Sequence, residues 1–178
     1  MPDTIALLRG VNVGGHRKLP MATLRAVAEG CGHRAVTTYI QSGNLLFDRA
    51  VDDLPAVAEE LRAAIERDAG VSTTVVLRTR EEWARVAAEH PFAGEATAEK
   101  NLCVVFLAGD PDPERVQALL ASDLQPEQLQ IRGRELYLHY PQGQARTRLN
   151  QGVLDRRVGV EGTARNWRTV RKLLVMLG

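Results

Sequence analysis

The order in which strand-like and helix-like segments alternate is the feature that most constrains this fold. Short apolar or β-branched runs at residues 5–8, 36–41, 44–47 and 73–77 are typical of strands. Apolar residues recur at helical spacing after Pro20 and again between Asp53 and Gly70. The resulting order of strand, helix, strand, strand, helix, strand predicts a ferredoxin-like α+β unit, in which two helices cover one face of an antiparallel sheet.

The second half of the chain partly repeats that order. Its expected elements are a capping-box helix from Thr79, a strand over 101–108, a helix from Asp112, a hairpin over 128–140 and a helical remainder ending in an amphipathic helix over 167–177. We therefore expect two ferredoxin-like α/β-sandwich halves in tandem, the second imperfect, with a C-terminal helix. A boundary near His90 gives domains of residues 1–90 and 91–178.

Composition excludes several classes of protein. The two cysteines, Cys31 and Cys103, have neither disulfide-framework nor zinc-ligand spacing, and the four histidines show no pairing at helical spacing. The first residues lack a basic segment of the kind that begins a signal peptide. The longest apolar run, 102–108, is far shorter than the roughly 20 residues of a membrane helix. We expect a soluble cytoplasmic protein with no membrane partner, no cofactor and no metal site.

Charge is unevenly distributed, although the 178 residues carry a net charge of only +1. Residues 1–48 carry +2, residues 49–145 carry −7 and residues 146–178 carry +6. The basic C-terminal arm can form a phosphate-binding face. It can also dock on the acidic middle of the same chain, which is the commoner outcome, or on that of a second copy, which would form a homodimer.

The segment from Arg9 to Gly15 follows a predicted strand and precedes a predicted helix. Arg9, Asn12, Gly14 and Gly15 are candidate ligand-binding residues, because small residues and backbone N–H groups at such a junction can cradle an anion. A P-loop is excluded, since His16 and Arg17 stand where Lys and Ser or Thr are required. Alternatively, the glycines only permit positive φ in the connection.

A second polar group of candidate ligand-binding residues consists of Tyr39, Gln41, Ser42 and Asn44. Alternation along a strand would place Tyr39 and Gln41 on one face, where they can hydrogen-bond a ligand together with Asn44. Ser42 lacks the G-x-S-x-G surroundings of a nucleophile. The alternative is a tight hairpin whose turn is supported by Ser42 and Asn44.

Arg165 and Asn166 complete the candidate site. Asn166 is placed to cap the last helix, and Arg165 would lie just outside that cap. A cation there opposes the helix dipole unless an anionic ligand or a carboxylate joins it. Either a ligand or a structural salt bridge would satisfy this requirement.

Three separated motifs make the chain resemble one bacterial family. They are ALLRGVNVGG at residues 6–15, TYIQSGN at 38–44 and TARNWRT at 163–169, and together they look like the signature segments of the domain of unknown function 1697 family. The resemblance implies a small cytoplasmic protein with a two-part ferredoxin-like α+β fold, and it brings no activity, substrate or catalytic residue. The chain departs from the family pattern at His16, Arg17 and Arg168, which argues against catalytic roles for these positions.

Three hypotheses of function follow. The first is a protein that binds a phosphate-bearing ligand, a nucleotide or RNA, through the polar Arg, Asn and Gln residues above, because guanidinium groups bind phosphate and amides bind base edges. The second is a metal-independent enzyme acting on a small phosphorylated or acyl metabolite. In the third, the motifs are structural and the chain is a protein-interaction module. The sequence leaves open whether the chain is an enzyme.

Overall fold

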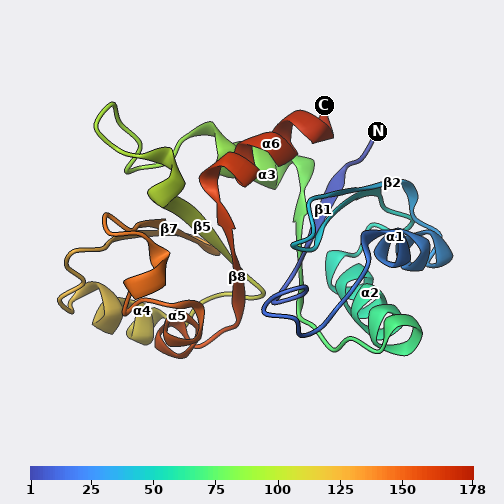
Figure 1. Ribbon diagram of the computed structural model, residues 1–178, viewed down its shortest axis with the longest axis horizontal. Helices are drawn as coiled ribbons and strands as arrows, with labels where there is room; N and C mark the ends of the chain where they lie inside the picture. The colour runs from blue at the N-terminus through green and yellow to red at the C-terminus, as the bar shows by residue number, and fades with distance from the viewer. The chain divides into compact units, whose positions relative to one another are not determined.

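The chain divides into two compact units, each built around one sheet. A computed structural model describes all residues, 1–178. The first unit comprises Met1–Ala84 with Leu173–Gly178, and the second comprises Arg85–Lys172. Each unit contains one four-stranded antiparallel sheet (Figure 1). The mixed α+β class expected from the sequence is confirmed, whereas the domain boundary near residue 90 stays a prediction.

The first sheet has the strand order β2-β3-β1-β4. Its elements follow the predicted order: β1 (Thr4–Leu8), α1 (Met21–Gly30), β2 (Arg34–Tyr39), β3 (Asn44–Asp48), α2 (Leu54–Ala69) and β4 (Val75–Thr79), followed by α3 (Arg80–Ala88). The central strand β1 pairs antiparallel with β3 on one side and β4 on the other. This is the ferredoxin-like arrangement.

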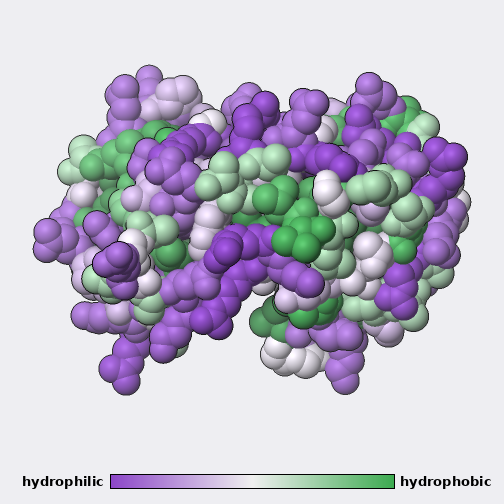
Figure 2. Space-filling model, turned by 90° about the horizontal axis from the view of Figure 1, so that it is seen from above, coloured by the Kyte–Doolittle hydropathy of each residue, from purple (hydrophilic) through white to green (hydrophobic).

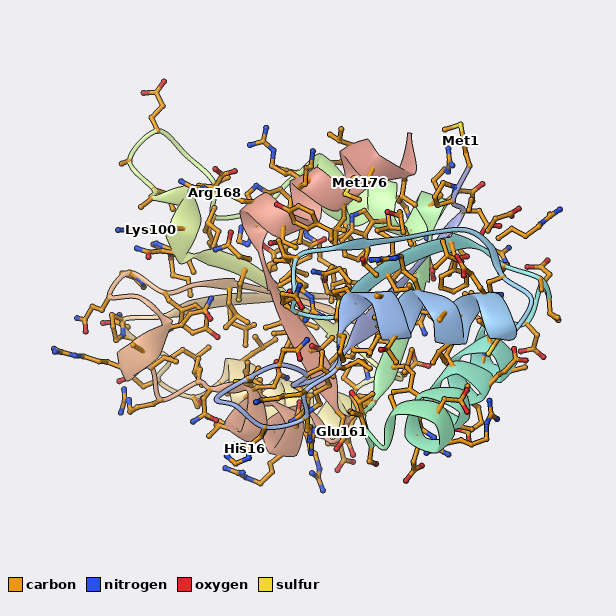
Figure 3. The ribbon with its side chains drawn as sticks, turned by 45° about the vertical axis from the view of Figure 1, so that its right-hand side comes forward. Met1, His16, Lys100, Glu161, Arg168 and Met176 are labelled. Carbon is orange, nitrogen blue, oxygen red and sulfur yellow. The ribbon has the colours of Figure 1, made fainter.

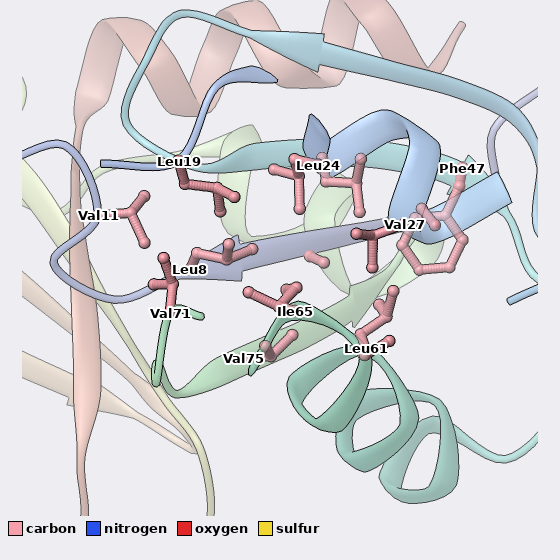
Figure 4. Packing of buried hydrophobic residues seen from close by; sticks show 14 of the residues in the cluster. Leu8, Val11, Leu19, Leu24, Val27, Phe47, Leu61, Ile65, Val71 and Val75 are labelled. Atoms are coloured by element: carbon pink, nitrogen blue, oxygen red, sulfur yellow. The ribbon is translucent and has the colours of Figure 1, made fainter. Parts of the chain in front are cut away.

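Helices α1 and α2 lie on the same side of the first sheet and enclose its core (Figures 1 and 4). Helix α2 begins where the side chain of Asp53 accepts a hydrogen bond from the Ala56 N–H, and it ends at Gly70. Leu61 and Ile65 of α2 are fully buried against the sheet residues Leu8 and Phe47. The helical spacing seen in the sequence thus forms the core of this unit.

The second sheet has the equivalent order, β6-β7-β5-β8. The second half of the chain contains η1 (Glu99–Asn101), β5 (Leu102–Leu107), α4 (Pro113–Leu120), β6 (Gln128–Arg132), β7 (Glu135–His139), η2 (Gln144–Arg146), α5 (Gln151–Val158), β8 (Gly162–Asn166) and α6 (Trp167–Leu177). The central strand is β5, which pairs antiparallel with β7 and β8. The second half therefore repeats the complete strand and helix order of the first.

One element was predicted wrongly. Residues 162–166 were expected to be part of a helical remainder, but they form strand β8 at the edge of the second sheet. Helix α5 stops at Gly159, which has φ of +80°, and β8 then pairs with β5 from Cys103↔Asn166 to Leu107↔Gly162. This strand supplies the element that seemed to be missing from an imperfect second half.

Both halves end with a buried arginine followed by a helix cap. Arg78 lies on β4 opposite Ile5, and Arg165 lies on β8 opposite Val104. Each guanidinium donates through Nη1 to the carbonyl of the preceding residue, at 2.7 Å for Arg78 and 2.9 Å for Arg165. The next residue caps the following helix, through the Thr79–Glu82 capping box in the first half and through Asn166 in the second.

The β2–β3 connection is longer than the two-residue turn expected from the sequence. Strand β2 ends at Tyr39, and residues 40–43 form the turn. Ile40 has φ of +49°, so the alternation of side chains stops there, and Tyr39 and Gln41 do not share a strand face. Gly43 has φ of +77° and packs closely: a Cβ atom there would lie 2.7 Å from both Leu8 Cβ and Val11 Cγ2.

We expect Gly43→Ala to destabilise the protein by about 2–4 kcal/mol, since it adds a clash with Leu8 and Val11 to the strain of positive φ. The matched control is Gly15→Ala, because Gly15 has the same φ of +77° with nothing within 4 Å of its added Cβ. The control should cost only about 1 kcal/mol. Urea unfolding followed by circular dichroism measures both values, and equal losses would contradict the packing argument.

Candidate functional site

Three connections meet at the end of the first sheet where β1 stops. The Leu8 N–H donates to the Gly43 carbonyl at 2.9 Å, and the Arg9 N–H donates to the Thr74 carbonyl at 3.0 Å. The Thr73 hydroxyl donates to the Arg9 carbonyl at 2.8 Å. The β1–α1 loop, the β2–β3 turn and the α2–β4 segment are therefore held together, so two of the three sequence motifs lie side by side.

The side chain of Asn12 joins the β1–α1 loop to the β2–β3 turn. Its Nδ2 donates to the carbonyls of Leu19, at 2.9 Å, and Gln41, at 2.7 Å, and its Oδ1 accepts from the Leu19 N–H at 2.8 Å. Asn12 has φ of +56°, a left-handed conformation that Asn tolerates better than most residues. Its amide therefore holds the loop in shape.

Between Asn12 and Leu19, the chain forms an exposed tip. Val13 and His16 pair across a tight turn, with the His16 N–H donating to the Val13 carbonyl at 3.0 Å. Gly14 and Gly15 occupy the two central positions with φ of +59° and +77°, as a type I′ turn requires. We call residues 13–18 the basic tip, because it carries His16, Arg17 and Lys18, all exposed. His16 is labelled on this loop in Figure 3.

The candidate residues of the second motif lie beside the base of the basic tip. Asn44 is fully buried, and its Nδ2 donates to the Tyr39 carbonyl and to the Ser42 hydroxyl, both at 3.0 Å. Gln41 is exposed, and its backbone carbonyl accepts from Asn12. Asn44 thus supports the turn, whereas the Gln41 side chain faces solvent.

Arg165 and Asn166 belong to the second unit. Arg165 is only 7% exposed and lies at the end of strand β8, in the position just before the Asn166 cap that the sequence predicts. Its Nη1 donates to the Thr163 hydroxyl at 2.8 Å and to the Ala164 carbonyl at 2.9 Å. Asn166 caps α6 as expected, since its Oδ1 accepts from the Arg168 N–H at 2.9 Å.

Burial shifts the pKa values of three groups in the interior. Burial raises the pKa of the Cys103 thiol to about 12 and lowers the pKa of the Arg165 guanidinium to about 10, so both keep their usual charge at neutral pH. Burial also raises the pKa of Tyr140, whose hydroxyl donates to the Leu149 carbonyl.

Two pockets of about 310 and 180 Å³ lie elsewhere in the chain and contain none of these three groups. They are lined by Asp3, Arg49, Thr79, Arg80 and Glu81, and by Asp123, Leu124, Glu127, Arg148, Leu149, Val153 and Arg157.

Two of the four histidines are core residues. His33 and His90 are each 3% exposed. The Nδ1 atom of His33 accepts from the Ala50 N–H at 3.2 Å, and that of His90 accepts from the Phe92 N–H at 3.3 Å. Burial lowers the pKa of both rings. They are therefore neutral parts of the structure, and no group of three or more metal-ligating side chains is present.

Sequence reasoning missed the most accessible cations of this region. Arg17 and Lys18 are the arginine and lysine side chains of the first unit that have no hydrogen-bond or ion-pair partner. Arg34, Arg62 and Arg67, by contrast, are paired with carboxylates. The sequence contains a partial indication that Arg17 and Lys18 are unpaired, because residues 4–28 contain no Asp or Glu that could pair with them locally.

Comparisons with known proteins agree with the family resemblance. The family model described as Protein of unknown function (DUF1697) matches residues 1–137. The chain belongs to this family. A solved structure with the same fold is that of the conserved bacterial protein SP0830 from Streptococcus pneumoniae, with 24% identity, 99% of each chain covered and a TM-score of 0.78. A search of curated proteins finds no match.

For this DUF1697 member, the match to the solved structure shows the fold alone. No helix of the present chain has the length and apolar character needed to cross a membrane.

We expect Asn12→Gly to destabilise the protein by about 1–3 kcal/mol, because three hydrogen bonds are lost while glycine keeps the positive φ free of strain. The control is Gln41→Ala, whose exposed side chain makes no hydrogen bond within the protein, and it should leave stability within about 0.5 kcal/mol. Thermal unfolding compares the two. Unchanged stability of Asn12→Gly would show that the amide serves a ligand and not the fold.

The free energy of unfolding should fall as the pH drops below about 6.5, the ordinary pKa of histidine. The pKa values of His33 and His90 are lowered in the folded state, so the unfolded chain binds more protons and stability is lost as the pH decreases. We expect a loss of the order of 1 kcal/mol between about pH 7.5 and pH 5.5.

Replacing each ring with Gln, as His33→Gln and His90→Gln, keeps an acceptor for the backbone N–H and should flatten this dependence. Denaturant unfolding at each pH is the measurement. A wild-type stability that stays constant or rises on acidification over this interval would refute the assignment of neutral buried rings.

Proposed function

We propose that the basic tip binds a phosphate-bearing ligand, either a nucleotide or RNA. The observation that carries this proposal is the pair Arg17 and Lys18, which are exposed and have no partner within the chain. A cation that is already paired must give up its carboxylate before it can bind an anion. Arg17 and Lys18 pay no such penalty, so a phosphate gains their full attraction.

The start of helix α1 supports the same ligand chemistry. Pro20 precedes the helix without a side-chain capping bond, and the first turn contains no acidic residue. The N–H groups of that turn and the positive end of the helix dipole both favour an anion. Arg25 of the same helix donates to the Thr38 hydroxyl at 2.7 Å, which leaves Lys18 and Arg17 as the unpaired cations beside the helix start.

The other candidate residues have different roles in this proposal. Asn12 and Asn44 shape the site through hydrogen bonds within the protein. Gly14 and Gly15 have open space around them, so a ligand can approach the backbone. Gln41 offers a solvent-facing amide for hydrogen bonds to a ligand. The participation of Arg9, Tyr39, Ser42, Arg165 and Asn166 stays a prediction.

The burial of the first sheet favours recognition through phosphate over recognition by base stacking. Ile5, Leu7, Leu46 and Val76, which alternate with the residues packed under the helices, are all no more than 1% exposed. Bases therefore cannot stack on that sheet face in the way that single-stranded RNA stacks on open sheets. The ligand would be held by its charge and not by a stacking platform.

Two further predictions about location and assembly remain. Cytoplasmic localisation stays a prediction, as does a homodimer formed through residues 49–145 and 146–178. Part of the basic arm is already neutralised within the chain, because Arg168 and Arg171 both pair with Glu99. This pairing reduces the charge available for a second copy.

The double variant Arg17→Ala/Lys18→Ala should bind a short single-stranded RNA about tenfold more weakly at low salt. The slope of log K against log salt should shrink by about 1.4, because about 0.7 is lost for each phosphate contact on a single strand. Fluorescence anisotropy with labelled RNA gives both quantities, and competition with ATP tells whether a free nucleotide occupies the same site.

The matched control is Arg62→Ala/Arg67→Ala, which removes the same two charges from exposed positions on α2. It should leave affinity and slope nearly unchanged. Equal losses in the two double variants would mean that only net charge matters. Absence of binding to RNA and to ATP by the wild-type protein at low salt would end the proposal.

A further inference from the structure

A single carboxylate bridges two arginines on helix α6. Arg168 and Arg171 are three residues apart and therefore lie on the same side of the helix. Glu99 Oε2 lies 3.3 Å from Arg168 Nε, and Glu99 Oε1 lies 2.8 Å from Arg171 Nη1. The guanidinium groups of Arg171 and Arg168 lower the pKa of Glu99. Each oxygen of this carboxylate thus serves one guanidinium.

Positive charge exceeds negative charge around this bridge. Lys172 follows Arg171 on the helix, and Lys100 follows Glu99. Both residues are exposed, and their side-chain amines have no hydrogen-bond or ion-pair partner. Lys100 is held near the start of α6, because its carbonyl accepts from Asn166 Nδ2 at 3.1 Å. Figure 3 labels Lys100 and Arg168. Two unpaired lysine side chains therefore adjoin the three bridged residues in the sequence.

The two arginines remain accessible while they are paired. Their side chains are 70% and 64% exposed, whereas Glu99 is 32% exposed. Hydrophilic residues cover much of the face seen from above (Figure 2). A ligand can therefore reach the outer side of both guanidinium groups without any rearrangement of α6.

We propose that Arg168, Arg171 and Lys172 form a second phosphate-binding site, and that Glu99 occupies this site as an internal competitor when no ligand is bound. A phosphate in a nucleic-acid backbone presents its oxygens to guanidinium groups as a carboxylate does, and a strand brings several phosphates to neighbouring cations. The ligand we assign is single-stranded RNA, since the cations lie on an exposed helix face. This inference does not depend on the basic tip of the first unit.

Glu99→Gln tests the competitor role. The amide keeps the size of the side chain and removes its charge, so the ion pairs to both arginines are lost. We expect the affinity for a short single-stranded RNA at low salt to rise about three- to tenfold, given the modest strength of exposed ion pairs. Glu99→Ala should give the same rise. Fluorescence anisotropy measures the affinity, and thermal unfolding verifies that each variant is folded.

The matched control is Glu59→Gln on α2. It also removes one negative charge, and it breaks an ion pair to an exposed arginine, Arg62, which keeps Glu66 as its second partner. This control should leave RNA affinity within about twofold of the wild type. Adding Arg168→Ala/Arg171→Ala to Glu99→Gln should abolish the gain.

An unchanged affinity in both Glu99 variants would overturn the inference, and so would an equal gain in Glu59→Gln. The ratio of Glu99→Gln to wild-type affinity should persist in the Arg17→Ala/Lys18→Ala background. If the basic tip does not bind RNA, the Arg17→Ala/Lys18→Ala change leaves the affinity of both proteins unaltered and the ratio still persists. If the second site does not bind RNA, the ratio itself is lost.

Discussion

Complete burial of the central strand in each sheet is the constraint on which the rest of the structure depends. Strands β1 and β5 are buried at every position and paired on both sides. Because a buried strand must have its N–H and C=O groups paired, each chain half has to bring back two strands that are distant in sequence. The loop that leaves β1 starts from this fixed frame. Val11 and Leu19, both in the core, anchor the two ends of that loop, and Asn12 locks them together.

Local patterns were sufficient for most of the fold. The α2 prediction succeeded because its cap, its apolar stripe and its terminating glycine lie within one short window, and the same is true of the Thr79–Glu82 capping box. The prediction for strand β8 was wrong because Gly162–Asn166 contains no apolar run. This segment becomes a strand by pairing with β5, which is far away in the sequence. The burial of Arg165 was missed for the same reason, since the residue before this helix cap belongs to a buried strand end.

The candidate site shows a different limit. The motifs at residues 9–15 and 38–44 could be predicted to be polar and turn-rich, and the structure brings them together through β1 and Asn12. Their chemistry could not be predicted, because an exposed amide and an amide that holds a loop look the same in sequence. The ion-pair partners of the arginines can be predicted only in part. The carboxylates that pair with Arg62 lie at helical spacing, but Arg168 meets Glu99 only after the chain has folded.

The pattern of ion pairs explains how a nearly neutral chain can offer anion sites. Most of the paired arginines meet carboxylates close in sequence, as Arg49 does with Asp52 and Arg67 with Asp68, so these charges cancel locally. The excess cations remain near the two ends of the sequence, on the basic tip and on α6.

At the basic tip, Arg17 and Lys18 have no carboxylate to displace. On α6, the phosphate must compete with Glu99, and the strength of that competition falls as salt screens an exposed pair. Salt therefore acts twice on the α6 site, weakening both the ligand and its internal competitor, so its net salt dependence is smaller than that of the open site in the first unit.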